Sequence, residues 1–147
     1  MRTKSARGTK RIASKLAQEI RSEKPKKHAF VILLHGNLGA GKTTFAQGFA
    51  GALGIKERIL SPTFVLMKIY PIRKKSAYKF LVHIDCYRID STKDVVRLGV
   101  KDIFLDKDAI VLVEWPERIR QIIPKRALLI RFGHGRKEQE RVIRIAN

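Results

Sequence analysis

The amino-acid sequence predicts an α/β fold in which a mostly parallel central sheet is flanked by helices and carries some antiparallel strands. Short apolar runs alternate with segments of helical periodicity along the 147 residues, an order typical of parallel sheets covered by helices. Two of these runs, residues 30–34 and 109–113, are continuous and contain no polar residue. Such runs are expected of strands that are buried on both faces.

The other elements follow in chain order without an internal repeat. A first helix is predicted where Ile12, Leu16 and Ile20 recur at a spacing of four, with Thr9 able to cap its start. A second helix follows residue 42, and Gly54 stands where glycine favours the end of a helix. The turn at 73–76 joins two expected strands into an antiparallel hairpin. The remaining expected elements are strands at 65–72, 79–86, 128–132 and 142–145 and short helices at 91–98 and 116–123.

A single P-loop ATPase domain is expected over residues 9–147, preceded by a flexible basic tail at residues 1–8. The tail lacks apolar periodicity, whereas the whole chain has the length and the 44% hydrophobic content of an ordinary core. The longest apolar run, residues 29–34, is too short to span a membrane, and no signal peptide is recognisable. The single cysteine, Cys86, cannot form an internal disulfide and is expected to be a small buried residue. A cytoplasmic protein without a membrane segment is therefore expected.

The net charge of the sequence is +19, from 32 Lys and Arg residues against 13 Asp and Glu. A charge of this size on a small domain favours a polyanionic partner such as RNA, DNA or an acidic protein. It is equally compatible with a solvated basic surface that has no specific partner. The sequence contains neither an aromatic RNA-reading signature nor Cys and His residues spaced as in a zinc finger, so the charge alone does not identify a partner.

Residues 36–43 carry the clearest chemical signal in the chain, because they match the P-loop pattern G-x-x-x-x-G-K-[ST]. The glycines let the backbone curl so that N–H groups point at an anion, and the following helix adds the positive end of its dipole. Lys42 would reach the β- and γ-phosphates, and the Thr43 hydroxyl would bind Mg²⁺. The pattern lies between a predicted buried strand and a helix, which is the context that indicates nucleotide binding. The predicted nucleotide-binding residues are Gly36, Asn37, Leu38, Gly39, Ala40, Gly41, Lys42, Thr43 and Thr44.

Two carboxylates stand at the ends of apolar strands. Glu114 ends the second continuous apolar run, where P-loop proteins place an acidic residue beside Mg²⁺. Asp85 ends another strand and could orient the attacking water, hold the outer shell of the metal or cap the next turn. Thr63 lies in a loop after the second helix, where switch proteins bring a threonine to the γ-phosphate. His83, close to Asp85 in sequence, is expected to be a structural strand residue.

Together these motifs resemble one family. The segments are Gly-Asn-Leu-Gly-Ala-Gly-Lys-Thr-Thr at 36–44, Ser-Pro-Thr-Phe at 61–64, His-Ile-Asp-Cys-Tyr-Arg at 83–88 and Val-Glu-Trp-Pro at 113–116. In this order and spacing they resemble the bacterial TsaE (YjeE) family, small ATPases of the tRNA threonylcarbamoyladenosine pathway. The resemblance extends over residues 9–146 and implies a compact P-loop fold with ATP and Mg²⁺ as ligands.

The resemblance also implies a role inside a protein complex. The family acts with the transferase subunit TsaD and its partner TsaB, which modify the adenosine next to the tRNA anticodon, and ATP hydrolysis is thought to reset that complex between turnovers. Carried over by position, Lys42 and Thr43 are the phosphate and Mg²⁺ residues and Glu114 is the second Mg²⁺ residue. Asp85 and Thr63 are the candidates for hydrolysis.

Two features depart from the resemblance. Asn37 stands where the family usually has Asp or Glu, which removes a negative charge near the phosphates. The net charge of +19 is more basic than expected of the family, and it makes tRNA a candidate partner of the basic surface. Neither departure changes Lys42, Thr43 or Glu114.

Other functions fit parts of the sequence. A small P-loop kinase would use the same loop, but it usually needs an Arg-rich lid, for which the chain leaves little room. A non-enzymatic RNA-binding module would use the basic surface, and its affinity would fall steeply with salt. The sequence has no Asn-Lys-x-Asp motif for reading guanine, which disfavours a GTPase. An Mg²⁺-dependent ATPase of tRNA modification is therefore the first interpretation.

Overall fold

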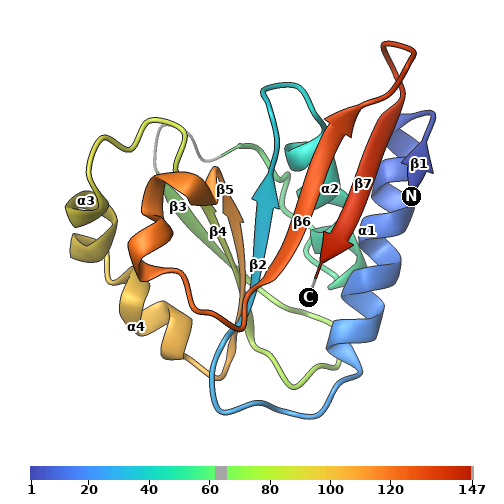
Figure 1. Cartoon of the computed structure of the whole chain (residues 1–147). Helices are drawn as coiled ribbons and strands as arrows, with labels where there is room; N and C mark the ends of the chain where they lie inside the picture. The colour runs from blue at the N-terminus through green and yellow to red at the C-terminus, as the bar shows by residue number, and fades with distance from the viewer. Residues whose placement is uncertain (62–65, 147) are drawn as a thin grey trace.

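The computed structural model describes residues 1–61 and 66–146, which form one seven-stranded sheet with helices on both faces (Figure 1). The strands are β1 (Arg2–Thr3), β2 (Phe30–His35), β3 (Met67–Pro71), β4 (Phe80–Asp85), β5 (Ala109–Glu114), β6 (Leu128–His134) and β7 (Arg141–Ala146). The α-helices are α1 (Ala6–Arg21), α2 (Lys42–Ala52), α3 (Thr92–Arg97) and α4 (Val100–Leu105), and η1 (Pro116–Ile122) is a 3₁₀-helix.

The centre of the sheet is parallel and its edges are antiparallel. The strand order is β1-β7-β6-β2-β5-β4-β3, and the four strands from β6 to β4 pair in parallel. Strands β7 and β1 add antiparallel pairs at one edge, and β3 pairs antiparallel with β4 at the other. This arrangement confirms the predicted fold class, and it confirms the predicted hairpin over the described part of that segment.

Apolar side chains on the two faces of the sheet form two cores. Helices α1 and α2 cover one face, where Ile32, Phe45 and Phe49 are fully buried. Helices α3, α4 and η1 cover part of the other face, where Val95 and Phe104 are buried. Strand β5 is buried along its whole length and β2 along most of it, as their continuous apolar runs predict.

The parallel register brings the carboxyl ends of three strands to one edge of the sheet. Leu34 of β2 pairs with Glu114 of β5, and Glu114 pairs in turn with Asp85 of β4. Open α/β sheets bind ligands in the crevice outside the carboxyl ends of their strands. The loop that follows β2 therefore starts beside both carboxylates.

The N-terminal segment does not form the flexible tail predicted for its first eight residues. Strand β1 pairs with β7, and Ser5 caps α1 by accepting a hydrogen bond from the Gly8 N–H. Thr9, which the sequence suggested as the cap, lies inside α1, and its buried hydroxyl is 3.0 Å from the hydroxyl of Thr3. The prediction failed because a two-residue strand and a polar first turn have no apolar periodicity.

The short helices differ in detail from the predicted ones. Helix α4 follows Gly99, in a segment where the sequence predicted no element. The helix predicted at 116–123 is the 3₁₀-helix η1 and carries Pro116 at its first position, as expected. Within the described residues, no helix has the length and apolar character needed to cross a membrane.

Candidate nucleotide-binding site

The loop of residues 36–41 joins β2 to α2 and has the backbone geometry of an anion-binding turn. Gly39 and Gly41 have φ angles of 73° and 100°, which residues with a Cβ rarely adopt. Gly41 is the N-cap residue of α2, and no side chain caps this helix. The N–H groups of its first turn, together with the positive end of the helix dipole, are therefore available to an anion.

Lys42 points back into this loop. Its Nζ donates hydrogen bonds to the carbonyl oxygens of Gly36 and Asn37, at 2.5 and 2.9 Å, and lies 4.4 Å from the centre of the Trp115 ring. The side chain is buried, and this burial lowers the pKa of Lys42 below its usual 10.5, while Glu114 in particular opposes the shift. The ammonium is thus held between the loop and an aromatic face.

The Glu114 carboxylate joins the loop to the sheet. Its Oε1 accepts a hydrogen bond from Oγ1 of Thr43 at 3.2 Å and a second one from Nε2 of His83 at 3.1 Å. Glu114 and His83 are both buried. Thr43 and Glu114, the two residues predicted to hold Mg²⁺, are therefore in direct contact.

Asp85 lies beside Glu114 and accepts hydrogen bonds from Ser61 and Tyr87. Ser61 Oγ donates to Oδ2 of Asp85 at 2.5 Å, and the N–H of Tyr87 donates to Oδ1 at 2.9 Å. The carboxylate is buried, and its hydrogen bond with Ser61 connects β4 to the chain after α2. Thr63, predicted to act in hydrolysis, lies outside the described residues.

The predicted residues converge on a cavity of about 310 Å³. Its lining comprises Leu38, Gly39, Gly41, Lys42, Thr43, Thr44, Ser61, Asp85, Tyr87, Glu114 and Trp115. Gly36 and Asn37 do not line this cavity and act instead through the carbonyls that hold Lys42. Ala40 is buried against the core. A second cavity of about 360 Å³ shares Gly39, Gly41 and Thr44 with the first.

The structure shows contacts of three residues at this site that the sequence did not predict. His83 is a buried strand residue, as expected, and its ring contacts the Glu114 carboxylate. Tyr87 and Trp115 line the cavity with their rings 4.9 Å apart. Because these contacts cross between strands, only the pairing of β4 with β5 reveals them. Cys86 is the inert core residue that was expected, since burial raises the pKa of its thiol to about 12.

Comparison with known proteins places this geometry in a family. The profile of the family described as "Threonylcarbamoyl adenosine biosynthesis protein TsaE" matches residues 3–143. The chain belongs to the TsaE family. This membership confirms the resemblance that the four sequence motifs indicated.

Curated members of the TsaE family support the assignment. The protein named tRNA threonylcarbamoyladenosine biosynthesis protein TsaE from Haemophilus influenzae is 34% identical over 106 residues, which are 72% of this chain and 64% of that protein. The protein of the same name from Bacillus subtilis is 37% identical, over 74% of this chain and 66% of its own length. The protein of the same name from Mycobacterium leprae is 30% identical, over 89% of this chain and 80% of its own length. The chain thus spans just under two thirds of the length of the first two relatives.

One solved bacterial structure shares the fold of this chain. The crystal structure of Bacillus subtilis YdiB superimposes with a TM-score of 0.74 and is 33% identical in sequence. The superposition covers 97% of this chain and 80% of YdiB. The α/β fold is therefore shared with a protein of known structure.

Proposed function

We propose that this protein is an Mg²⁺-dependent ATPase that serves threonylcarbamoyladenosine biosynthesis in tRNA. One observation carries the ATPase assignment: Lys42, Thr43, Asp85 and Glu114 line a single cavity at the N-terminus of α2. This combination of a cation, a hydroxyl and two carboxylates is the set that phosphoryl transfer in P-loop proteins requires. Membership of the TsaE family supports the role in tRNA modification.

The oxygen atoms next to α2 fit a magnesium ion. The hydroxyl of Thr43 and the carboxylate of Glu114 already approach each other to 3.2 Å. Hydroxyl and carboxylate oxygens are ligands that Mg²⁺ prefers, with phosphate and water completing its shell. When bound to these residues, the ion would neutralise negative charge on the β- and γ-phosphates.

The two cavities that meet at the loop fit a nucleoside triphosphate. The triphosphate would lie along the loop and reach Lys42, and the cavity that shares Gly39, Gly41 and Thr44 would receive the nucleoside. Hydrolysis breaks the bond from the γ-phosphorus to the bridging oxygen and releases ADP and phosphate. We assign Asp85 to orient the attacking water, which bonds to the γ-phosphorus; the hydrogen bonds from Ser61 and Tyr87 to its carboxylate support this role, as does its place in the lining of the cavity.

The proposed ATPase works as an accessory subunit. We expect hydrolysis by the isolated protein to be slow and the TsaD and TsaB subunits of the transferase to stimulate it. Catalysis at such a site is mainly positional and electrostatic, so a partner that closes the cavity accelerates the reaction. Phosphate release from ATP, measured with and without the two subunits, tests this role, and equal rates in both states would contradict it.

Substitution of Lys42 tests the site itself. We expect Lys42→Ala to lose ATP binding, measured by calorimetry, because the phosphates lose their main cationic contact. The matched control is Lys101→Ala, which removes an exposed lysine of α4 with the same change of charge. Circular dichroism establishes that both variants fold. Wild-type ATP affinity in a folded Lys42→Ala protein would refute the assignment.

A further inference from the structure

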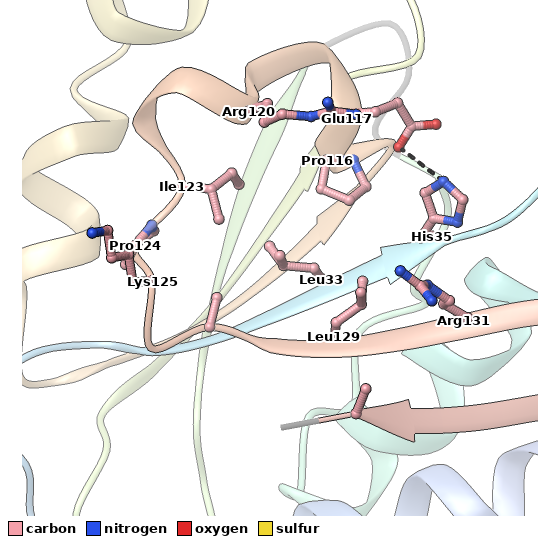
Figure 2. Close-up of a pocket in the computed structure, with 12 residues that line it drawn as sticks. Leu33, His35, Pro116, Glu117, Arg120, Ile123, Pro124, Lys125, Leu129 and Arg131 are labelled. Carbon is pink, nitrogen blue, oxygen red and sulfur yellow. Dashed lines mark ion pairs between the residues drawn. The ribbon is translucent and has the colours of Figure 1, made fainter.

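A groove of about 670 Å³ lies outside the nucleotide-binding site, between η1 and the strands β2 and β6 (Figure 2). Its floor is apolar: Leu33, Ile123 and Leu129 face the same space in Figure 2. Pro116 and Ala127 also line the groove. These residues belong to the face of the sheet that α3, α4 and η1 cover only in part. In Figure 1, these helices lie over β3, β4 and β5, while β6 and β7 extend beyond them.

The rim of the groove is cationic. Arg120, Lys125 and Arg131 line it, and all three are exposed. Among the described residues, none of the three forms an ion pair. Arg144 stands opposite Arg131 in the register of β6 and β7 and extends the positive charge along the open face.

Of the residues that the structure describes, Glu117 is the one carboxylate that lines the groove, and its buried Oε2 accepts no hydrogen bond from them. Glu117 Oε2 lies 3.9 Å from Nε2 of His35 at the end nearest the phosphate-binding loop. This contact is visible as the dashed line in Figure 2. Within the described part of the chain, the three cations of the rim therefore outnumber the one carboxylate of the groove.

We propose that this groove binds an acidic, amphipathic segment of a protein partner. Apolar side chains of such a segment would cover the floor, and its carboxylates would meet the three cations of the rim. A protein segment fits better than RNA because the floor of the groove is apolar, and a phosphate backbone gains nothing from an apolar floor.

Consecutive residues of the chain link the groove to the nucleotide-binding site. Pro116 lines the groove, while the preceding residues Glu114 and Trp115 line the nucleotide cavity. Trp115 has a φ angle of 56°, a left-handed conformation that is sparsely populated for residues other than glycine. A segment seated against Pro116 therefore contacts the turn that holds Trp115 over Lys42. Binding of the segment does not itself require a nucleotide, so it is measured separately from the proposed ATPase function.

The test uses a synthetic acidic peptide as the probe. The peptide carries Leu at spacings of three and four and Glu at the flanking positions, so that it presents an apolar stripe between carboxylates. Binding is followed by amide chemical shifts of the isotopically labelled protein at moderate salt. We expect the shifted residues to cluster at the groove, in β2, η1 and β6. A peptide with Gln in place of every Glu is expected to bind at least about tenfold more weakly.

Charge reversal on the protein localises the binding. Arg120→Glu with Arg131→Glu should weaken peptide binding by at least about tenfold. The matched control, Arg97→Glu with Lys101→Glu, makes the same change of charge at exposed positions of α3 and α4 and should leave the affinity within about twofold. The amide spectra of both double variants establish that the fold survives.

Four results would overturn the proposal: no binding, shifts spread over the whole basic surface, equal loss in both double variants, or tighter binding of a uridine oligonucleotide in the same groove. The last result would assign the groove to RNA. ATP affinity, measured on the same samples, separates this outcome from the proposed function. Loss of ATP binding with intact peptide binding refutes only the ATPase, and the reverse pattern refutes only the groove.

Discussion

At the scale of single residues, the Glu114 carboxylate is the point where the sheet and the phosphate-binding loop meet. One oxygen of this buried group accepts from both Thr43 and His83. The Nδ1 of His83 is buried and has no hydrogen-bond partner among the described residues. The imidazole is therefore held in place chiefly by its contact with Glu114 and by packing, and it fixes the direction in which the carboxylate points.

This arrangement predicts that His83 positions Glu114 for magnesium. We expect His83→Leu to reduce Mg²⁺-dependent ATP binding by about tenfold, because ligands that lose an orienting hydrogen bond bind metals less well. The free energy of unfolding should fall by about 1–3 kcal/mol, since a buried carboxylate loses a donor. Calorimetric ATP titrations with and without Mg²⁺, together with urea unfolding, measure the two effects.

His83→Gln is the matched variant for this prediction. A glutamine amide can donate from nearly the same place as Nε2, so it should restore much of the Mg²⁺-dependent affinity. If both variants lose stability but keep the Mg²⁺ dependence of ATP binding, His83 is only a packing residue.

The sequence predicts residues of this site well where they are contiguous. The P-loop is a local pattern, and its lysine, threonine and glycines lie where the pattern requires. Glu114 and Asp85 were found because each ends an apolar run, and parallel pairing brings such ends together. The contact of His83 with Glu114 was not predicted, because it joins residues 31 positions apart along the chain, which no local pattern records.

At the scale of the elements, the close packing of α1 against α2 positions the phosphate-binding loop. A Cβ added to Gly48 of α2 would lie 2.5 Å from both the Cα and the carbonyl oxygen of Lys10 in α1. These are backbone atoms and cannot move aside without shifting a helix. The two helices can approach this closely only because residue 48 has no side chain.

Two glycines of α2 therefore make a matched test. Gly48→Ala should lower the free energy of unfolding by about 1–3 kcal/mol, because the added methyl group overpacks the interface. Gly51→Ala should be neutral or raise it by up to about 1 kcal/mol, since a Cβ there meets nothing within 4 Å and alanine favours helices. Urea unfolding of both variants measures the difference. Equal effects would show that helix propensity, not contact with α1, decides the outcome.

The elements that the sequence missed are short. Strand β1 has two residues and helix α4 has six, so neither spans enough of a period to be recognised. β1 exists because β7 offers it an edge to pair with, and α4 because Val100 and Phe104 cover β5. Long-range packing creates these elements, whereas the long apolar runs that form β2 and β5 carry their own signal.

At the scale of the whole molecule, the net charge of +19 leaves many basic side chains without an acidic partner. The Lys and Glu or Asp pairs within the described residues, such as Lys26 with Glu23 and Lys79 with Asp108, are largely exposed. Exposed pairs contribute little to stability. Repulsion between like charges is therefore expected to destabilise the compact state at low ionic strength.

This balance predicts that simple salt stabilises the protein. Raising sodium chloride from about 0.01 to 0.1 M shortens the screening length from about 30 to 10 Å, and the melting temperature should rise by about 2–6 °C because repulsion across the surface is screened. Calorimetric melting at several salt concentrations measures the change. The same rise is expected in Lys42→Ala, which separates screening from anion binding in the phosphate loop. A melting temperature that falls with salt would mean that ion pairs stabilise this protein more than its net charge destabilises it.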